Sequence, residues 1–233
     1  MIKSLSVIVP AYNEEKRLLK SMSKIISFIK ELKIPTELIL VDDGSTDKTA
    51  EIARKAGAKV ISYKPNKGKG NAVRTGVFAA KNEWVLFMDA DLSTPLNMYP
   101  RLAQHYKNDF IIGSRNMKDS DIQLERGWFR KLLGKGFPLI TRILLLPGIK
   151  DTQCGYKLMR TKEAKKVFKL SRINGFGFDA EILFIAKKNG YSIKEVPVVW
   201  KNDAASKVHP IKDTWRMFWN VVGIRINNIK GKY

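Results

Sequence analysis

Cysteine and histidine are nearly absent from this chain, which has one thiol, Cys154, and two imidazoles, His105 and His209, among 233 residues. A lone cysteine cannot form an internal disulfide, and there are too few Cys and His residues for a structural zinc centre. A reducing compartment therefore fits the composition best. We expect Cys154 to be a small buried thiol and both histidines to have surface or packing roles.

Long apolar runs are also missing. No uncharged stretch approaches the roughly 20 apolar residues of a membrane span, and residues 1–15 lack the cleavage site of a signal peptide. We therefore expect a chain that does not cross a bilayer.

Acidic residues are scarce relative to basic ones, since 22 Asp and Glu against 43 Lys and Arg give a formal net charge of +21. The excess is concentrated between Arg115 and Arg172, where 15 residues are basic and 5 are acidic. Such a charge demands anionic partners. The remaining composition, 44% hydrophobic and 28% charged, is that of an ordinary globular protein, and we expect one domain over residues 1–233.

Short β-branched runs alternate with amphipathic helical patterns in the first half of the chain. The expected strands are residues 6–12, 37–44, 58–63, 83–91 and 110–115, and the expected helices are residues 13–32 with Asn13 as N-cap, Ser45–Ala56 closed by Gly57, and Gly70–Lys81. This alternation predicts an α/β fold with a doubly wound, mostly parallel sheet. In the less regular second half we expect two short helices within 126–146, a strand over 192–200 and an amphipathic helix over 212–229.

Ligands of doubly wound sheets bind at the carboxyl ends of the strands. In this chain those ends carry residues 10–14, 42–45, 89–91 and 113–115. Asp89 and Asp91, two positions apart behind a buried strand, can both reach one hard cation whose other ligands are phosphate oxygens. Their structural alternative is to cap the helix that begins near Pro95.

Two further segments near these strand ends have two interpretations each. Asp42 and Asp43 can accept hydrogen bonds from a base or a ribose, and the same turn can cap the following helix. Residues 64–72, KPNKGKGNA, lack the spacing and the Gly-Lys-Ser/Thr ending of a Walker A loop. They are either a basic loop beside a nucleotide or a solvated run of charge.

Taken in order, the segments VPAYNE, VDDGSTDKT, NKGKGNA, DADL and GSR resemble the family 2 glycosyltransferases, which have the GT-A nucleotide-sugar fold. The later segments DTQCGYKLM, GFGFDAE, EVPVVW and SKV are similar to the polyprenyl-phosphate sugar synthases, and most similar to the dolichyl-phosphate β-glucosyltransferases. The resemblance covers nearly the whole chain. It implies a nucleotide-binding half, residues 1–115, and a half that binds the acceptor and the membrane interface, residues 116–233.

The resemblance also implies roles for individual residues. The implied set comprises nucleoside contacts at Pro10, Tyr12, Glu14 and Asp42, a nucleotide-sugar contact at Lys69, metal contacts at Asp91 and Asp89, and donor-phosphate contacts at Asp89, Arg115 and Lys207. Asp91 is the expected direct ligand of a Mg²⁺ or Mn²⁺ ion.

A polyprenyl phosphate has an anionic head and a long apolar tail, so its site needs cations beside exposed apolar surface. Arg126, Arg130 and Lys131 are the expected cations, next to an apolar helical stripe within 128–140. An ordinary core-facing helix with solvated flanks is the alternative for this segment.

The C-terminal helix carries a second apolar stripe, made of Trp215, Phe218, Trp219, Val222, Ile226 and Ile229. Trp together with nearby Arg suits a membrane-water interface, and basic surfaces are attracted to anionic leaflets. We therefore expect a peripheral protein on the cytoplasmic face of a membrane.

The implied reaction is a single displacement with inversion at the anomeric carbon. The lipid phosphate attacks, and the metal on Asp91, with Arg115 and Lys207, neutralises the leaving nucleoside diphosphate. A phosphate monoester has a second pKa of about 6 and is already ionised at neutral pH, so no base is required. Asp179 and Glu181, in GFGFDAE, are expected to orient the donor sugar or the acceptor, or alternatively to complement a helix N-terminus.

Three alternatives stay open at this point. The first alternative is that the donor is GDP-mannose instead of UDP-glucose. The second is that the acceptor is a saccharide, in which case Asp179 or Glu181 is needed as a base. The third alternative is that the positive charge serves nucleic-acid binding, but the basic segment has no recognisable reader motif and, without a metal, the acidic strand ends would repel phosphates. We therefore expect no nucleic-acid partner.

Overall fold

The computed structural model describes residues 1–123, 141–142, 144–201 and 210–233. Along the chain the elements are β1 (Leu5–Ala11), α1 (Glu15–Glu31), β2 (Thr36–Asp42), α2 (Thr49–Lys55), β3 (Lys59–Ser62), α3 (Lys69–Ala79), β4 (Trp84–Met88), η1 (Leu96–Met98), α4 (Tyr99–Ala103), β5 (Phe110–Ser114), β6 (Asp121–Gln123), β7 (Tyr156–Arg160), α6 (Thr161–Leu170), α7 (Phe178–Lys188), β8 (Ile193–Pro197), β9 (Val199–Lys201) and α8 (Pro210–Ile229).

Within the described residues, the main sheet has seven strands in the order β3-β2-β1-β4-β7-β5-β8. Its neighbouring strands are parallel except around β7, which runs antiparallel to both β4 and β5. A separate parallel ribbon joins β6 to β9. The predicted α/β fold with a mostly parallel sheet is confirmed.

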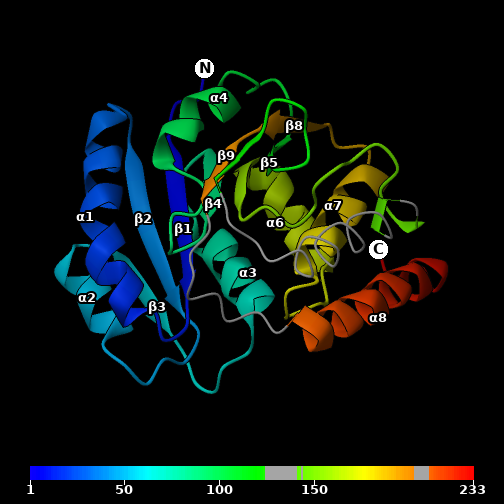
Figure 1. The fold of residues 1–233 in the computed structure, drawn as a ribbon, viewed down its shortest axis with the longest axis horizontal. Coiled ribbons are helices and arrows are strands. Elements are labelled where there is room, and N and C mark those ends of the chain that lie inside the picture. Colours follow the sequence, from blue (N-terminus) through cyan, green and yellow to red (C-terminus); the bar gives the residue numbers. More distant parts are fainter. Residues whose placement is uncertain (124–140, 143, 202–209) are drawn as a thin grey trace.

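Helices cover both faces of this sheet, with α1 and α2 on one side and α3, α6, α7 and α8 on the other (Figure 1). Successive residues of a strand point to opposite faces, so β1 gives Val7 and Val9 to one apolar core and Ile8 to the other. The core under α1 and α2 also receives α4. Each core extends over several neighbouring strands on its own face of the sheet, so packed side chains support the strand ends.

Two helix starts differ from the prediction. Asn13 does not cap α1: it has a positive φ of 52°, and its side-chain oxygen accepts a hydrogen bond from the Thr46 N–H at 2.8 Å. The second helix begins at Thr49 instead of Ser45, because the intervening residues form turns against the end of β1. Gly57 follows α2 with a φ of 83°, as expected for a residue that closes a helix.

Two strands also differ. The expected strand 192–200 is divided into β8 and β9 at Val198, whose N–H still donates to the Ser114 carbonyl of the main sheet while its carbonyl accepts from the Asp121 N–H, so the chain passes there from the main sheet to the β6–β9 ribbon. Strand β7 was not predicted, since Lys157 and Arg160 interrupt its apolar pattern. The expected helices within 126–146 lie almost entirely outside the described residues.

Candidate active site

The carboxyl ends of β1, β2 and β4 meet at one edge of the sheet. Strand β1 lies between the other two, and its register places Ala11 beside Asp42. Residues 10–14, 42–45 and 89–91 therefore lie at one edge, as the sequence predicted. Pro10 is buried in β1, and Tyr12, one residue beyond the strand, is exposed.

Asp42 and Asp43 organise the loops at the end of β2. Asp42 accepts a hydrogen bond from the Ser45 N–H at 2.9 Å and so closes a local turn. Asp43 accepts hydrogen bonds from the backbone N–H groups of Lys67 and Gly68, both at 2.8 Å. The basic loop is therefore fixed beside the strand ends, as the nucleotide-loop interpretation requires.

Glu14 also has partners within the protein. Its carboxylate accepts hydrogen bonds from Arg17 Nη1 at 2.9 Å, and its backbone N–H donates to Thr49 Oγ1 at 2.8 Å. These contacts tie the end of β1 to α1 and α2. The nucleoside roles of Pro10, Tyr12, Glu14 and Asp42 stay predictions.

Lys69, the first residue of α3, forms an ion pair with Asp89 in which Nζ lies 2.6 Å from Oδ1. Burial disfavours the ammonium, but Asp89, Asp179 and Asp91 outweigh it and raise the pKa of Lys69. A Cβ atom at Gly155 would lie 1.9 Å from Asp89 Oδ2, so the backbone before β7 presses directly on this carboxylate. Asp89 is thus held between the Gly155 backbone and the Lys69 ammonium.

Asp91 has a backbone partner: one of its oxygens accepts a hydrogen bond from the Ser93 N–H at 2.9 Å. Burial and the neighbouring Asp89 charge raise the pKa of Asp91. A cation bound here would stabilise the ionised form, so the site suits a hard metal ion. Among the described residues no group of three or more His, Cys, Asp or Glu residues could hold a metal, so the other ligands would have to come from a bound molecule or water.

Arg115, the residue after β5, is held by Asp151. Its Nε and Nη2 donate to the two Asp151 oxygens at 2.7 and 2.9 Å, and its backbone N–H donates at 2.9 Å. The guanidinium also lies over the Trp200 ring, with 5.4 Å between Cζ and the ring centroid. Among the described residues the pair uses Nε and Nη2, so Nη1 can contact a further anion. Sequence reasoning did not single out Asp151, although it begins the quoted segment DTQCGYKLM.

Asp179 lies in the first turn of α7 and forms a buried ion pair with Lys157 of β7. The Lys157 Nζ is 2.5 Å from Asp179 Oδ1 and donates a second hydrogen bond to the Cys154 carbonyl. Burial raises the pKa of Asp179, while Lys157 and Lys69 oppose that effect. Lys157 was missed at the sequence level, because a lysine in a short segment carries no sign that it will be fully buried.

Glu181 is also buried, but its partners are structural. It accepts hydrogen bonds from the backbone N–H groups of Arg172 and Ile173 and from the Tyr233 hydroxyl, at 2.7 to 3.0 Å. The same loop places the Asn174 carbonyl against the N–H of Gly70 in α3 at 2.7 Å. Glu181 therefore holds the loop that supports α3, and its role in orienting the sugar or the acceptor stays a prediction.

The remaining predicted site residues are Lys207, Arg126, Arg130 and Lys131, which lie outside the described residues. Of the residues with predicted packing roles, Cys154 is fully buried and burial raises its pKa to about 11, as expected for an inert thiol. His105 is partly buried, and burial lowers its pKa.

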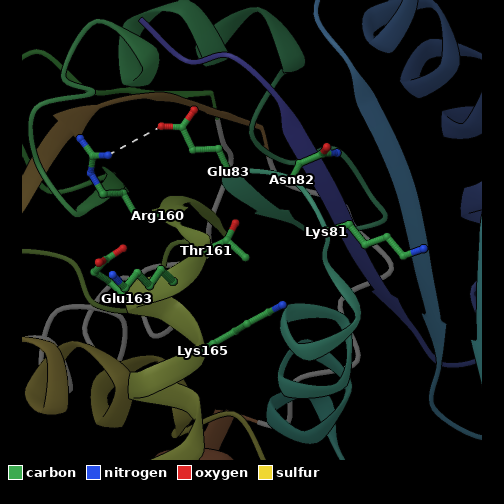
Figure 2. Close-up of a pocket in the computed structure, with 8 residues that line it drawn as sticks. Lys81, Asn82, Glu83, Arg160, Thr161, Glu163 and Lys165 are labelled. Carbon is green, nitrogen blue, oxygen red and sulfur yellow. Dashed lines mark ion pairs between the residues drawn. The ribbon is translucent and has the colours of Figure 1, made fainter.

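A cavity of about 530 Å³ lies elsewhere in the molecule (Figure 2). It is lined by residues 81–83 before β4, by the last residue of β7 and by the first turns of α6, and it includes the Glu83–Arg160 ion pair at 3.9 Å. Because β4 starts and β7 ends there, the cavity is at the opposite edge of the sheet from Asp89. It is not part of the candidate active site.

Comparison with known proteins agrees with this geometry. A sequence profile of the family described as "Glycosyl transferase family 2" matches residues 6–168. Among curated relatives, the "Dolichyl-phosphate beta-glucosyltransferase" of Dictyostelium discoideum is 36% identical over 97% of this chain and 75% of its own length. The Homo sapiens protein of the same name is 34% identical over 99% of this chain and 78% of its own length.

A solved structure is also similar. It is glucosyl-3-phosphoglycerate synthase from Mycobacterium tuberculosis in complex with Mn²⁺, UDP-glucose and phosphoglyceric acid. The TM-score is 0.69 at 19% sequence identity, and the match covers 95% of this chain and 79% of the other. This likeness confirms the GT-A fold.

Proposed function

The chain belongs to glycosyl transferase family 2, and from that membership we propose that it transfers glucose from UDP-glucose to dolichyl or another polyprenyl phosphate. The product is a β-linked lipid-phosphate glucose, formed by inversion. The observation that carries this proposal is the identity of 34 to 36%, over nearly the whole chain, to two relatives named for that activity.

The donor binds at the carboxyl ends of β1, β2 and β4. Pro10, Tyr12, Glu14 and Asp42 contact the nucleoside. Lys69, Arg115 and Lys207 contact the diphosphate. The fixed positions of Lys69 on Asp89 and of Arg115 on Asp151 support this assignment, because anchored cations bind a diphosphate without first losing side-chain freedom.

Asp91, assisted by Asp89, holds a Mg²⁺ or Mn²⁺ ion. The raised pKa of Asp91, caused by burial and by Asp89, supports a bound cation, and a structural neighbour was solved with Mn²⁺. When bound, the ion neutralises negative charge that develops on the leaving diphosphate. The chain's own contribution is to keep both carboxylates in place, through the Ser93 N–H on Asp91 and the backbone of Gly155 on Asp89.

The acceptor phosphate attacks without help from a protein base. The second pKa of a phosphate monoester is about 6, so it is ionised at neutral pH. The contacts of Asp179 and Glu181 do not favour a role as a general base, since Asp179 is paired with Lys157 and Glu181 accepts hydrogen bonds from backbone N–H groups. This arrangement favours a lipid phosphate over a saccharide acceptor, which would need deprotonation.

The enzyme acts at a membrane surface, on its cytoplasmic face. Arg126, Arg130 and Lys131 hold the lipid phosphate. On α8, Val221 and Ile224 are buried in the core, whereas Trp219, Ile226 and Ile229 of the predicted stripe are exposed. Among the described residues no helix combines the length and apolarity needed to cross a bilayer. An exposed apolar face with Trp supports binding in the interface plane.

The test is a transfer assay with the purified chain, a short polyprenyl phosphate in detergent, Mg²⁺ or Mn²⁺, and radiolabelled UDP-glucose or GDP-mannose. We expect an organic-soluble, mild-acid-labile glucosyl lipid from UDP-glucose. Transfer from GDP-mannose but not from UDP-glucose would show that the donor is GDP-mannose. Release of free sugar with no lipid product, or transfer only to a saccharide, would contradict the assignment of a polyprenyl phosphate as the acceptor.

A further inference from the structure

Four side chains of alternating charge line the space beneath the donor site: Lys157, Asp179, Lys69 and Asp89. The Lys157 Nζ contacts Asp179 at 2.5 Å, and the Lys69 Nζ contacts Asp89 at 2.6 Å. Lys69 also senses the Asp179 charge, which links the two ion pairs into one row. Lys157 is the member of this row that has no role in the chemistry described so far.

The ring of Phe87 on β4 connects the two lysines. The Lys69 Nζ is 5.4 Å from the centroid of this ring and the Lys157 Nζ is 5.7 Å from it. In the pairing of β7 with β4, Lys157 lies opposite Phe87, and Phe87 is two residues before Asp89 in the chain. Both ammonium groups therefore contact the same ring, and Lys69 also contacts the Asp89 carboxylate.

The two lysines differ in freedom. Lys157 has no exposed surface, and its Nζ is held by two acceptors, the Asp179 carboxylate and the Cys154 carbonyl. Lys69 is 22% exposed, and its contact with Asp89 is at the mouth of the site. An ammonium is a compact charge on a flexible four-carbon stem, so it can turn between neighbouring carboxylates. Without its own cation, Asp179 would compete with Asp89 for Lys69.

We propose that Lys157 is a positioning residue for the donor, which holds the Asp179 carboxylate so that Lys69 stays beside Asp89, where the diphosphate binds. This inference deepens the proposed function and rests on its assignment of the donor site. It predicts that loss of Lys157 weakens diphosphate binding through Lys69, although Lys157 itself touches no part of the donor. A merely structural Lys157, which ties β7 to α7, would affect folding and leave ligand binding by the folded protein unchanged.

The experiment measures UDP binding by calorimetry in the presence of Mn²⁺, using the full chain. UDP is the probe because it carries the diphosphate but no sugar, so contacts of Asp179 with a sugar hydroxyl do not enter. For Lys157→Met we expect the dissociation constant to rise about tenfold, a coupling of the size seen between neighbouring charges. For Lys157→Met combined with Asp179→Asn we expect a value within about threefold of wild type, because no carboxylate then competes for Lys69.

Arg160→Met is the matched control, since it also removes a cation from β7. Arg160 lies at the far end of the strand, near Glu83 and Asp109, and should leave UDP binding unchanged. Circular dichroism checks that each variant is folded. If Lys157→Met does not fold, the double variant decides alone: folded protein that binds UDP tenfold more weakly than wild type overturns the proposal. Wild-type affinity in Lys157→Met, or no recovery in the double variant, also overturns it.

Failure of the proposed donor gives a different result. A wild-type chain that binds GDP but not UDP would replace the nucleotide, and the same three variants would then be compared with GDP. A wild-type chain that binds neither nucleotide would contradict the proposed function and, with it, the premise of this inference.

Discussion

Arg115 and Asp151 face each other through two parallel hydrogen bonds, from Nε to Oδ2 at 2.7 Å and from Nη2 to Oδ1 at 2.9 Å. Asp151 has no exposed surface and also accepts the Gln153 N–H at 3.0 Å. A carboxylate so completely satisfied fixes the plane of the guanidinium. Arg115 is therefore presented to a ligand in one orientation.

Asp151→Asn should destabilise the protein by about 3 to 5 kcal/mol at pH 7, because it leaves Arg115 partly buried without its counter-charge. Burial raises and Arg115 lowers the pKa of Asp151, and the net shift is downward. The stabilisation is therefore present above the unfolded pKa of about 3.9 and is lost as the pH falls through the lower folded value. Urea unfolding of wild type and variant should show a gap at pH 7 that narrows in strong acid.

The matched control for Asp151→Asn is Glu51→Gln, which breaks the exposed pair with Lys55 on α2. Exposed i,i+4 pairs contribute little, so no measurable change is expected. Equal stability of Asp151→Asn and wild type at pH 7 would contradict the role given to this pair.

Asp91→Asn should lower kcat/KM by a factor on the order of 10² or more, as loss of a group that stabilises leaving-group charge does. The same substitution should weaken Mn²⁺ binding, measured by the paramagnetic signal of the free ion, while thermal stability is kept. Asp119→Asn, at an exposed carboxylate between β5 and β6, should change neither. Full turnover of Asp91→Asn in EDTA would rule out the metal.

Gly155→Ala should displace the Asp89 side chain, because the added Cβ would lie 1.9 Å from Oδ2. We expect overpacking to lower the free energy of unfolding by about 1 to 3 kcal/mol. We also expect turnover per folded molecule to fall, because Asp89 is displaced. Gly223→Ala in α8 is the control, since a Cβ there meets nothing within 4 Å and alanine favours a helix. A Gly155→Ala enzyme with wild-type turnover would show that Asp89 need not hold its observed place.

Glu181→Gln should keep turnover within about tenfold of wild type, since loss of a true general base costs 10² to 10⁴. Its effect should appear in stability, because an amide cannot accept from Arg172, Ile173 and Tyr233 as a carboxylate does. Tyr233→Phe, which removes one of these donors, should cost about 1 kcal/mol. Chemical unfolding and initial rates measure both effects. Inactive but stable Glu181→Gln would restore the base hypothesis.

Trp219→Ser together with Ile229→Ser should weaken binding to vesicles of anionic phospholipid by about tenfold or more, because both exposed side chains would lose apolar burial in the interface. Co-sedimentation measures the bound fraction. Leu19→Ser removes an apolar side chain that is 65% exposed on α1, on the other side of the sheet, and should have no effect. Equal losses for both sets would mean that α8 is not the membrane face.

The sequence predicted the parts of the fold that depend on local pattern. Strand ends at Asp42 and Asp89 could be placed because apolar runs stop where acidic residues begin. Strand β7 could not, because its central Lys157 is buried only through a partner, Asp179, that is 22 residues away. The pairing of Arg115 with Asp151 is equally non-local, at 36 residues. Residues that neutralise each other across the fold leave no periodic signal in the chain.

Strand β5 has its two neighbours, β7 and β8, entirely in the part of the chain that follows it, after residue 155. On the ribosome, β5 emerges with no strand to pair with, and its five residues must wait for most of the protein to be synthesised. Arg115, at the end of β5, is then positioned late. Folding of this edge of the sheet therefore waits for residues 156–197, long after strands β1 to β4 have been synthesised.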